Sequence, residues 1–204
     1  LQLLHLMPFE ADFYEPFGFV FSDFHFKMDL DIAEFYRLGD KHAARQFRWE
    51  NVDMTRLDEW LPRLERAYER CTARYDLSVE RKGMRRWQAL TDDLAMEGGF
   101  LKLLIDEHNE PAGLLAYIMK EEALFVREAL ASDGASRQAI YYYIASHRSQ
   151  VKNVQWSAQD NEAIVFRRGK DKDGVRYQPF MMNYILDPMV LPLLTKAVPS
   201  EDLW

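Results

Sequence analysis

PFEADFYEPFGF, residues Pro8–Phe19, is the stretch that decides how the first part of this chain folds. The apolar run before it, Leu1–Met7, predicts a buried strand that ends at the proline. Acidic residues at the start of Glu10–Glu15 suit the positive end of a short helix, and Pro16 with Gly18 ends that helix. The stretch therefore predicts a strand, a short helix and a sharp exit from the helix.

Phe19–Leu30, directly after this exit, alternates apolar and polar residues as a half-buried strand does. Its aromatic residues occupy odd positions up to Phe21 and even positions from Phe24. The change of parity at Ser22–Asp23 predicts a bulge within one long strand. A strand needs partners, and no partner precedes Leu1. We therefore expect residues 1–30 to be the end of a domain whose earlier part lies outside this sequence.

The chain after Gly39 predicts a second unit in which helical and strand patterns alternate. Strands are expected at 44–52, 100–105, 112–120, 123–131, 154–157 and 175–186, and helices from about 60, at 81–94, at 135–147 and at 161–166. The three strands from 100 to 131 are separated by short turns, which is typical of an antiparallel meander. The predicted fold class is α+β, with a mixed, mostly antiparallel sheet flanked by helices.

Two local signals predict how the first long helix begins. Thr55 and Asp58 have the spacing of a capping pair. Pro62 is tolerated best in the first turn of a helix, so the helix is expected to start near Trp60.

Composition excludes several classes of protein. The 26 Lys and Arg against 33 Asp and Glu give a net charge of −7, which argues against a nucleic-acid partner. No apolar run approaches the roughly 18–20 residues of a membrane span, so no membrane partner is expected. Cys71 is alone and cannot form an internal disulfide, which favours a reducing, cytoplasmic location.

Motifs for other chemistries are missing or have a simpler interpretation. Neither a G-x-S-x-G elbow nor a phosphate or dinucleotide loop occurs. Cys71 lies on the apolar side of a helix, where a packed thiol is expected. Tyr141–Tyr143 would point in three directions from a helix and cannot form one stacking platform. No metal site is expected because the histidines lack ligand spacing; they are His5, His25, His42, His108 and His147.

The opening stretch resembles part of the GNAT acetyltransferase fold. Its pattern a-x-x-Y-x-x-x-G-F is matched here by Ala11, Phe13, Tyr14, Phe17, Gly18 and Phe19. The resemblance implies that Tyr14 lies beside the coenzyme A sulfur and protonates the departing thiolate as the catalytic acid. A phenol with a pKa of about 10 is close to a thiol in acidity, so this proton transfer is nearly balanced.

The remaining chain resembles the second domain of the enhanced intracellular survival (Eis) family of multi-domain acetyltransferases. The similar stretches follow the order of that family: Glu110–Tyr117, Val126–Ala129, Tyr143–Val151 and Phe180–Leu186. The resemblance implies a GNAT-like fold in three parts. Residues 1–39 would end a catalytic GNAT domain, 40–190 would form a second, degenerate one, and 191–204 would be a linker. It also implies acetyl-CoA as co-substrate, a primary amine as acceptor, and a homo-oligomer.

The phosphate-binding motif of the family is not matched. GNAT enzymes bind the coenzyme pyrophosphate with a Q/R-x-x-G-x-G/A loop at a helix N-terminus, and the equivalent junction here is Ala131–Ser136, ASDGAS. It has one glycine, and Asp133 would repel a phosphate. We therefore expect this domain not to bind acetyl-CoA and assign no coenzyme-binding residue. The terminal carboxylate that serves the family as general base has no match in Trp204.

The charge at the start of the chain indicates which kind of acceptor substrate the protein would attract. Residues 1–31 contain six acidic side chains against Lys27 and carry −5 of the net charge. A negative rim near Tyr14 would attract cationic amines such as lysines, polyamines or aminoglycosides, although solvated carboxylates with no such role are an equal alternative. The alternative function is a non-catalytic scaffold or oligomerisation module.

Overall fold

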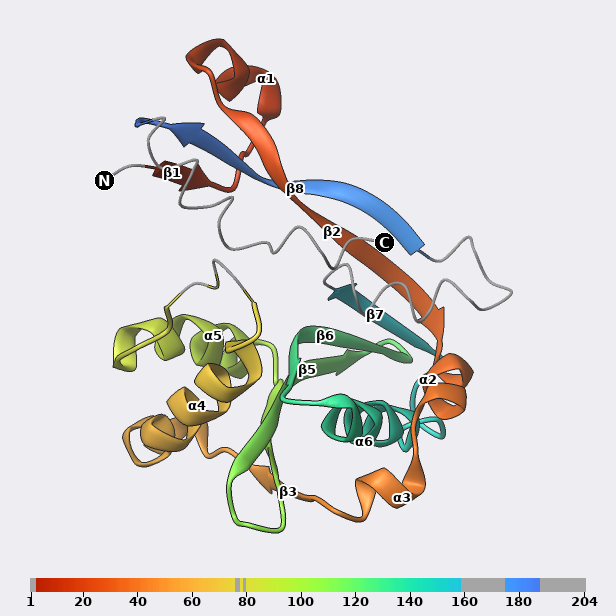
Figure 1. The fold of residues 1–204 in the computed structure, drawn as a ribbon. Coiled ribbons are helices and arrows are strands. Elements are labelled where there is room, and N and C mark those ends of the chain that lie inside the picture. Colours follow the sequence, from red (N-terminus) through yellow and green to blue (C-terminus); the bar gives the residue numbers. More distant parts are fainter. Residues whose placement is uncertain (1–2, 76–77, 79, 159–174, 188–204) are drawn as a thin grey trace, which may run out of the picture.

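The computed structural model describes residues 3–75, 78, 80–158 and 175–187. Its strands form one eight-stranded sheet in the order β1-β8-β2-β7-β6-β5-β4-β3 (Figure 1). All described pairings are antiparallel except the pairing of β6 with β7. The strands are β1 (Leu3–Leu6), β2 (Val20–Asp31), β3 (Arg48–Asn51), β4 (Phe100–Ile105), β5 (Pro111–Lys120), β6 (Ala123–Ala131), β7 (Asn153–Ala158) and β8 (Val175–Ile185).

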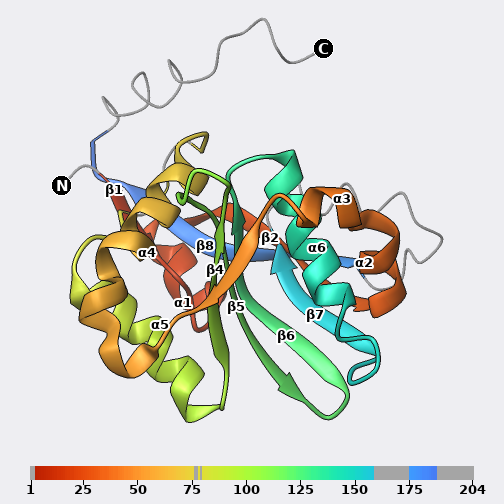
Figure 2. The same ribbon diagram turned by 90° about the horizontal axis from the view of Figure 1, so that it is seen from below.

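Helices cover both faces of the sheet, which confirms the predicted α+β class. Figure 2 shows α4 and α5 on one face and α2, α3 and α6 on the other. The helices are α1 (Ala11–Tyr14), α2 (Ile32–Leu38), α3 (Lys41–Ala44), α4 (Leu57–Thr72), α5 (Met84–Met96) and α6 (Gly134–Ala145), with 3₁₀ turns η1 (Glu15–Phe17) and η2 (Met54–Arg56). None of the described helices is long and apolar enough to cross a membrane.

The central strand β5 supplies side chains to the cores on both faces. Its sequence is an almost unbroken apolar run, and Pro111–Ile118 is buried throughout. Leu114 and Ile118 pack in the core beneath α4 and α5, whereas Leu115 and Tyr117 pack in the core beneath α2 and α6. Alternation along a strand sends neighbouring side chains to opposite faces, so one apolar run stabilises both helical layers.

The long strand β2 has the predicted bulge. Its pairing with β8 shifts register on both sides of Asp23, between Phe21 and Phe24. Beyond this point β2 also pairs with β7, and the even-numbered residues from Phe26 onward face the core. The parity change read from the sequence is therefore a real discontinuity in the ladder.

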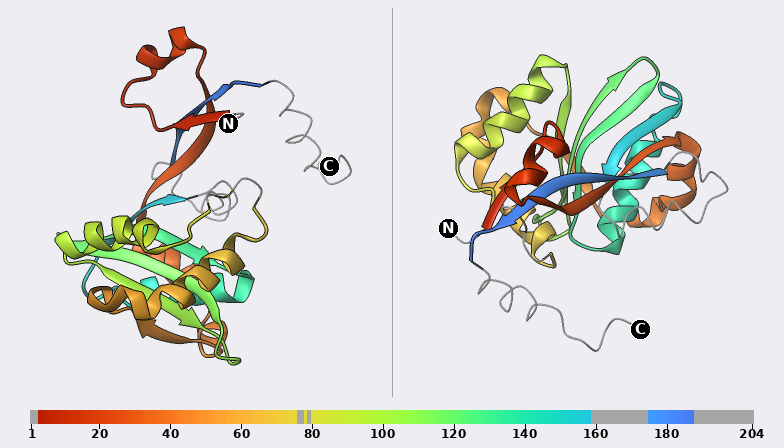
Figure 3. Two further views of the ribbon diagram at one scale, coloured as in Figure 1. Left: turned by 90° about the vertical axis from the view of Figure 1, so that its left-hand side faces the viewer. Right: turned by 90° about the horizontal axis from the view of Figure 1, so that it is seen from above.

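The other end of β2 belongs to a projecting part of the sheet. Figures 1 and 3 show β1, α1 and the adjoining ends of β2 and β8 extending away from the helical layers. We call this part the arm and define it as residues 3–24 with 179–185. Among its described side chains only Met182 is fully enclosed. The arm shares its sheet with the rest of the chain, and the expected division at residue 39 stays a prediction.

Local capping differs from the expectation around residues 32–62. The prediction of a Thr55–Asp58 capping pair was wrong, because the Asp53 side chain accepts the Thr55 N–H (3.0 Å) and α4 begins at Leu57. Pro62 therefore lies inside α4, where it is exposed and has no N–H to donate to the Asp58 carbonyl. The start expected near Trp60 was three residues too late.

Two short helices precede β3 where the sequence pattern predicted none. Asp31 caps α2 and Asp40 caps α3 by accepting backbone N–H groups. Because α3 includes Ala44, the strand expected at 44–52 is shortened to β3. The expected helix at 161–166 and the expected linker at 191–204 lie outside the described residues.

Gly39 allows α2 and α6 to pack closely, so we expect Gly39→Ala to destabilise the fold. A Cβ at this position would lie 2.5 Å from the Tyr142 backbone nitrogen. Backbone atoms cannot move aside cheaply, so the free energy of unfolding should fall by about 1–3 kcal/mol, measured by urea denaturation. Gly134→Ala is the control, since nothing lies within 4 Å of its Cβ. Equal stability of the two variants would contradict this packing.

Candidate functional site

The parallel strands β6 and β7 separate toward their carboxyl ends. They pair only from Ala123 with Asn153 to Val126 with Trp156. At the same level the β5 register shifts from Ala116 opposite Glu128 to Tyr117 opposite Val126, so Arg127 is the extra residue of a bulge. Beyond Val126 no described strand pairs with this edge of β6. Backbone N–H and C=O groups along that edge are available to an extended, amide-bearing ligand.

The bulge directs two charged side chains of β6 toward α4 and α5. Arg127 forms ion pairs with Glu97 and with Asp93 of α5. Glu128 accepts a hydrogen bond from Arg81 at 2.6 Å, in a partly buried pair. Both side chains are therefore held on the same side of the sheet as the α4–α5 layer, and not in the opening between β6 and β7.

The N-terminus of α6, directly after β6, is already occupied by a carboxylate. Asp133 accepts the Ser136 N–H at 2.8 Å, and the Asp133 N–H donates to the Ser136 hydroxyl at 3.0 Å. Burial favours the neutral carboxyl, but hydrogen bonds from Ser136 and Ser132 outweigh it and the pKa of Asp133 is lowered. Asp133 therefore already occupies the Ser136 amide, and the expectation that this junction does not bind a phosphate stays a prediction.

Tyr14 lies at the end of α1 within an aromatic cluster. Its ring contacts Phe9, Phe13 and Phe19, with centroids 5.0–5.8 Å apart and edge-on geometry. The Tyr14 hydroxyl makes no hydrogen bond to any residue in the described ranges, and the ring is partly exposed. Phe13 and Phe17 are exposed beside it. The hydroxyl is therefore free to meet a ligand or solvent.

Gly18 sets the position of this cluster over β8. Its φ of +87° lies in the left-handed region that favours glycine, and a Cβ there would lie 2.9 Å from the Tyr184 ring. The Gly18 N–H donates to the Glu15 carbonyl and closes η1. The glycine of the motif is thus needed for the helix exit and for the approach to β8.

Tyr14 and Asp133 do not form one site. Figure 1 shows α1 at the opposite end of β2 from α6. Of the acidic residues in 1–31, Glu10, Asp12, Glu15 and Asp29 are exposed, and Asp31 caps α2. The structure thus assigns one of the six a local structural role.

The other residues singled out from the sequence have packing roles. Cys71 is buried, and burial raises the pKa of its thiol to about 12, which confirms a packed thiol. Tyr141 contacts Phe35, whereas Tyr143 bonds the Tyr117 hydroxyl at 2.9 Å. The tyrosine run therefore points in different directions, as predicted.

Sequence reasoning missed a basic cluster at the start of α5. Arg81, Arg85 and Arg86 line one pocket. The signal was present, because the segment 80–86 has four cationic residues against Glu80 in a chain of net charge −7. It was not recognised because its charges were interpreted only as part of a helical pattern.

Comparison with known proteins identifies the family. The sequence model of the acetyltransferase (GNAT) domain matches residues 78–185, from before α5 to the end of β8. Because the match extends over more than half of the chain, the chain belongs to the GNAT acetyltransferase family. No curated protein sequence matches it significantly.

Solved structures agree on the fold. A protein of unknown function from Enterococcus faecalis V583, described as a probable N-acyltransferase, has a TM-score of 0.70 at 16% identity over 92% of this chain and 46% of its own. A GCN5-related N-acetyltransferase from Anabaena variabilis has a TM-score of 0.69 at 18% identity, over 90% of this chain and 46% of its own. Another from Kribbella flavida has a TM-score of 0.62 at 17% identity, over 92% of this chain and 44% of its own. The chain spans less than half the length of these proteins.

These findings confirm the GNAT-like fold. Identities below 20% show the fold and neither the substrate nor membership of the Eis family.

Loss of the Asp133 cap should destabilise α6 in a pH-dependent way. Asp133→Ala removes the acceptor for the Ser136 N–H and should lower the free energy of unfolding by about 0.5–2 kcal/mol at neutral pH. The lowered pKa means that this stabilisation exists above about pH 4 and is lost as the pH falls through the folded-state pKa. Urea denaturation from pH 7 to pH 2.5 measures both effects.

Asp133→Asn is the matched control, because asparagine caps helices about as well without a charge. It should keep most of the stability at pH 7 and show a weaker acid dependence. A difference between wild type and Asp133→Ala that stays constant below pH 4 would contradict the role of the charged carboxylate.

Proposed function

We propose that this chain is part of an Eis-like N-acetyltransferase that transfers acetyl from acetyl-CoA to a primary amine. The match of the GNAT family over residues 78–185 carries the proposal. The partly exposed Tyr14, held within its aromatic cluster, supports a catalytic role for this side chain. In this proposal residues 1–39 end the catalytic domain, and 40–190 form a second domain that lacks a coenzyme site.

The proposed reaction forms one C–N bond and breaks one C–S bond. The neutral amine attacks the thioester carbonyl, and the tetrahedral intermediate expels coenzyme A as a thiolate. The Tyr14 hydroxyl donates its proton to that sulfur, and water restores it because the ring is partly exposed. Phenol and thiol have ordinary pKa values of about 10 and 8.5, so the transfer costs little. The group that removes the proton from the amine is not assigned to this chain.

Acetyl-CoA would be held mainly by protein outside this chain. At α6 the Asp133 carboxylate already accepts the Ser136 N–H, which leaves the pyrophosphate without its amides and beside a like charge. The arm has few buried side chains, as expected for a part that packs against further protein. The structural relatives have about twice the length of this chain, which leaves room for such a domain.

The proposed acceptor is a cationic amine. Glu10, Asp12 and Glu15 are exposed on α1 and its flanks, next to Tyr14. Their field would raise the local concentration of lysine, polyamine or aminoglycoside substrates. The amine must lose a proton before it attacks, so the same carboxylates would also oppose that step to some degree.

A non-catalytic scaffold is the second candidate. The exposed side chains Phe9, Phe13 and Phe17 favour it, since aromatic residues are enriched where proteins associate. In this case Tyr14 would be one more contact residue of the arm. The two candidates differ in whether the Tyr14 hydroxyl, rather than its ring, is needed.

The first test concerns acetyl-CoA binding by residues 1–204. Because the α6 amides are capped, isothermal titration should detect no binding tighter than about 1 mM, the upper end of ordinary substrate constants. The protein with the upstream domain serves as the control and should bind. Micromolar binding by residues 1–204 would contradict the assignment of a degenerate second domain.

The second test replaces the Tyr14 hydroxyl in the protein that also contains the upstream domain. Tyr14→Phe should lower kcat by about 10²–10⁴-fold, the usual contribution of a positioned general acid. Its circular dichroism should not change, because the ring contacts remain. Tyr177→Phe, at an exposed tyrosine of β8, is the control and should keep full activity. Unchanged acetyl transfer by Tyr14→Phe would favour the scaffold.

A further inference from the structure

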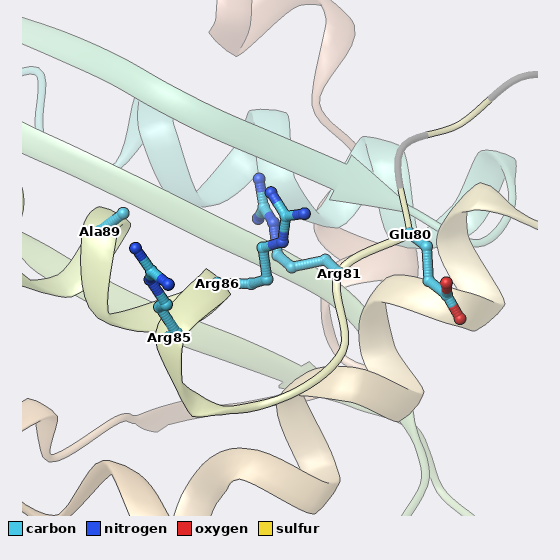
Figure 4. A pocket seen from close by; sticks show the side chains of 5 residues that line it. All are labelled: Glu80, Arg81, Arg85, Arg86 and Ala89. Atoms are coloured by element: carbon cyan, nitrogen blue, oxygen red, sulfur yellow. The ribbon is translucent and has the colours of Figure 1, made fainter. Parts of the chain in front are cut away.

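A pocket of about 580 Å³ lies where the segment 80–83 enters α5, away from Tyr14 and from the N-terminus of α6. Its lining consists of Glu80, Arg81, Arg85, Arg86 and Ala89. Figure 4 shows the guanidinium groups of Arg81 and Arg86 together, Arg85 beside them on α5, and the Glu80 carboxylate turned away. Three of these five lining residues are therefore cationic, and the volume is ordinary for a small-molecule site.

Arg81 is the fixed part of the pocket. Its Nη1 donates to Glu128 of β6 at 2.6 Å. Its guanidinium also lies over the rings of Tyr68 and Trp87, at 4.8 and 5.0 Å from their centroids. An arginine held by an ion pair and two aromatic faces keeps its remaining N–H groups in a fixed direction. Arg81 can therefore orient a bound ligand through these N–H groups, although Glu128 already neutralises its charge.

Arg85 and Arg86 supply the charge that is not neutralised. Both are exposed, and neither has a carboxylate within 4 Å in the described part of the chain. The acidic lining residue, Glu80, is paired with Lys82 at 3.2 Å. Two positive charges that line this pocket thus have no ion-pair partner among the described residues, in a protein whose net charge is −7.

The position of these arginines is electrostatically unfavourable without an anion. They stand in the first turn of α5, which has no acidic residue, and its N-cap Gly83 offers no side-chain acceptor. The first turn of a helix favours negative charge because its N–H groups point outward. The Glu65 carboxylate accepts the Gly83 N–H, so one acidic group from α4 already lies at this helix start. Neither Arg85 nor Arg86 forms an ion pair with it, and an anion in the pocket would add the charge that these two side chains lack.

We propose that this pocket binds the phosphate group of a small phosphate monoester. A phosphate monoester carries close to two negative charges at neutral pH, which equals the two arginine charges that lack a partner. Its tetrahedral oxygens accept the paired N–H groups of arginine in bidentate fashion. The volume of the pocket exceeds that of one phosphate and leaves room for the esterified group. The site is distinct from the proposed acetyl transfer and does not depend on it.

The test uses residues 1–204 with inorganic phosphate and glycerol 1-phosphate as probes, and glycerol as the uncharged control. Chemical-shift changes of the arginine Nε–H groups are followed by NMR at constant ionic strength. Saturable shifts at Arg85 and Arg86 are expected with both anions and not with glycerol. Absence of saturable shifts at Arg85 and Arg86 with both anions would overturn the proposal.

Variants separate a specific site from general attraction by positive charge. Arg85→Ala with Arg86→Ala should weaken phosphate binding at least tenfold, and both residues are exposed, so the fold should be retained. The matched control, Arg45→Ala with Arg176→Ala, removes two exposed arginines elsewhere and should keep the affinity. Arg85→Lys with Arg86→Lys keeps the two charges without the bidentate geometry of arginine. This variant should bind phosphate with intermediate affinity. Equal weakening by both alanine pairs would overturn the proposal.

Acetyl-CoA itself contains a phosphate monoester, so one further comparison keeps the two proposals apart. Weak acetyl-CoA binding that disappears with Arg85→Ala and Arg86→Ala belongs to this pocket. Binding that survives both substitutions would contradict the degenerate coenzyme site at α6 and would leave the phosphate pocket to be judged by the NMR titration.

Discussion

Burial of β5 on both of its faces is the constraint on which the rest of the structure depends. Leu114 and Ile118 contribute to one core and Leu115 and Tyr117 to the other, so neither helical layer can be removed without exposing the same strand. The meander β4–β5–β6 is built around it, and α6 is joined to it by the hydrogen bond between Tyr117 and Tyr143. The bulge at Arg127 and the opening between β6 and β7 lie at the edge of this rigid unit.

The opening between β6 and β7 leads to a helix whose N-terminus is capped from within the chain. The strands separate after Val126 and Trp156, and α6 follows β6 as the family requires. At that point Asp133 satisfies the helix N-terminus from within the chain. The same amide cannot serve a carboxylate and a phosphate together, so local helix stability and coenzyme binding compete for one group. The capping box favours stability.

Much of the fold could be predicted because the spacing of apolar residues along the chain determines the helices and strands. The bulge near Ser22 followed from a change of parity, and the meander followed from short turns between apolar runs. The start of α4 and the helices α2 and α3 were not predicted, because Asp31, Asp40 and Asp53 act as caps through single contacts that no periodic pattern reveals. Tyr14 was predicted as a functional residue because it belongs to a sequence motif. The pocket of Arg81, Arg85 and Arg86 was missed because only the three-dimensional structure brings these side chains to one place.

By itself, the sequence determined the α+β class, most strands, the Gly18 helix exit and the acidic residue Asp133 at the start of α6. These properties depend on residue type and on spacing along the chain, which local sterics and periodicity translate directly into structure. Only the tertiary structure decided that β2 lies between β8 and β7, and that the arm is far from α6. Likewise it brought Arg81 to Glu128 and placed no carboxylate of the described ranges within 4 Å of Arg85 or Arg86. Such pairings join residues far apart in sequence, and their energies arise only when the completed sheet brings those groups together.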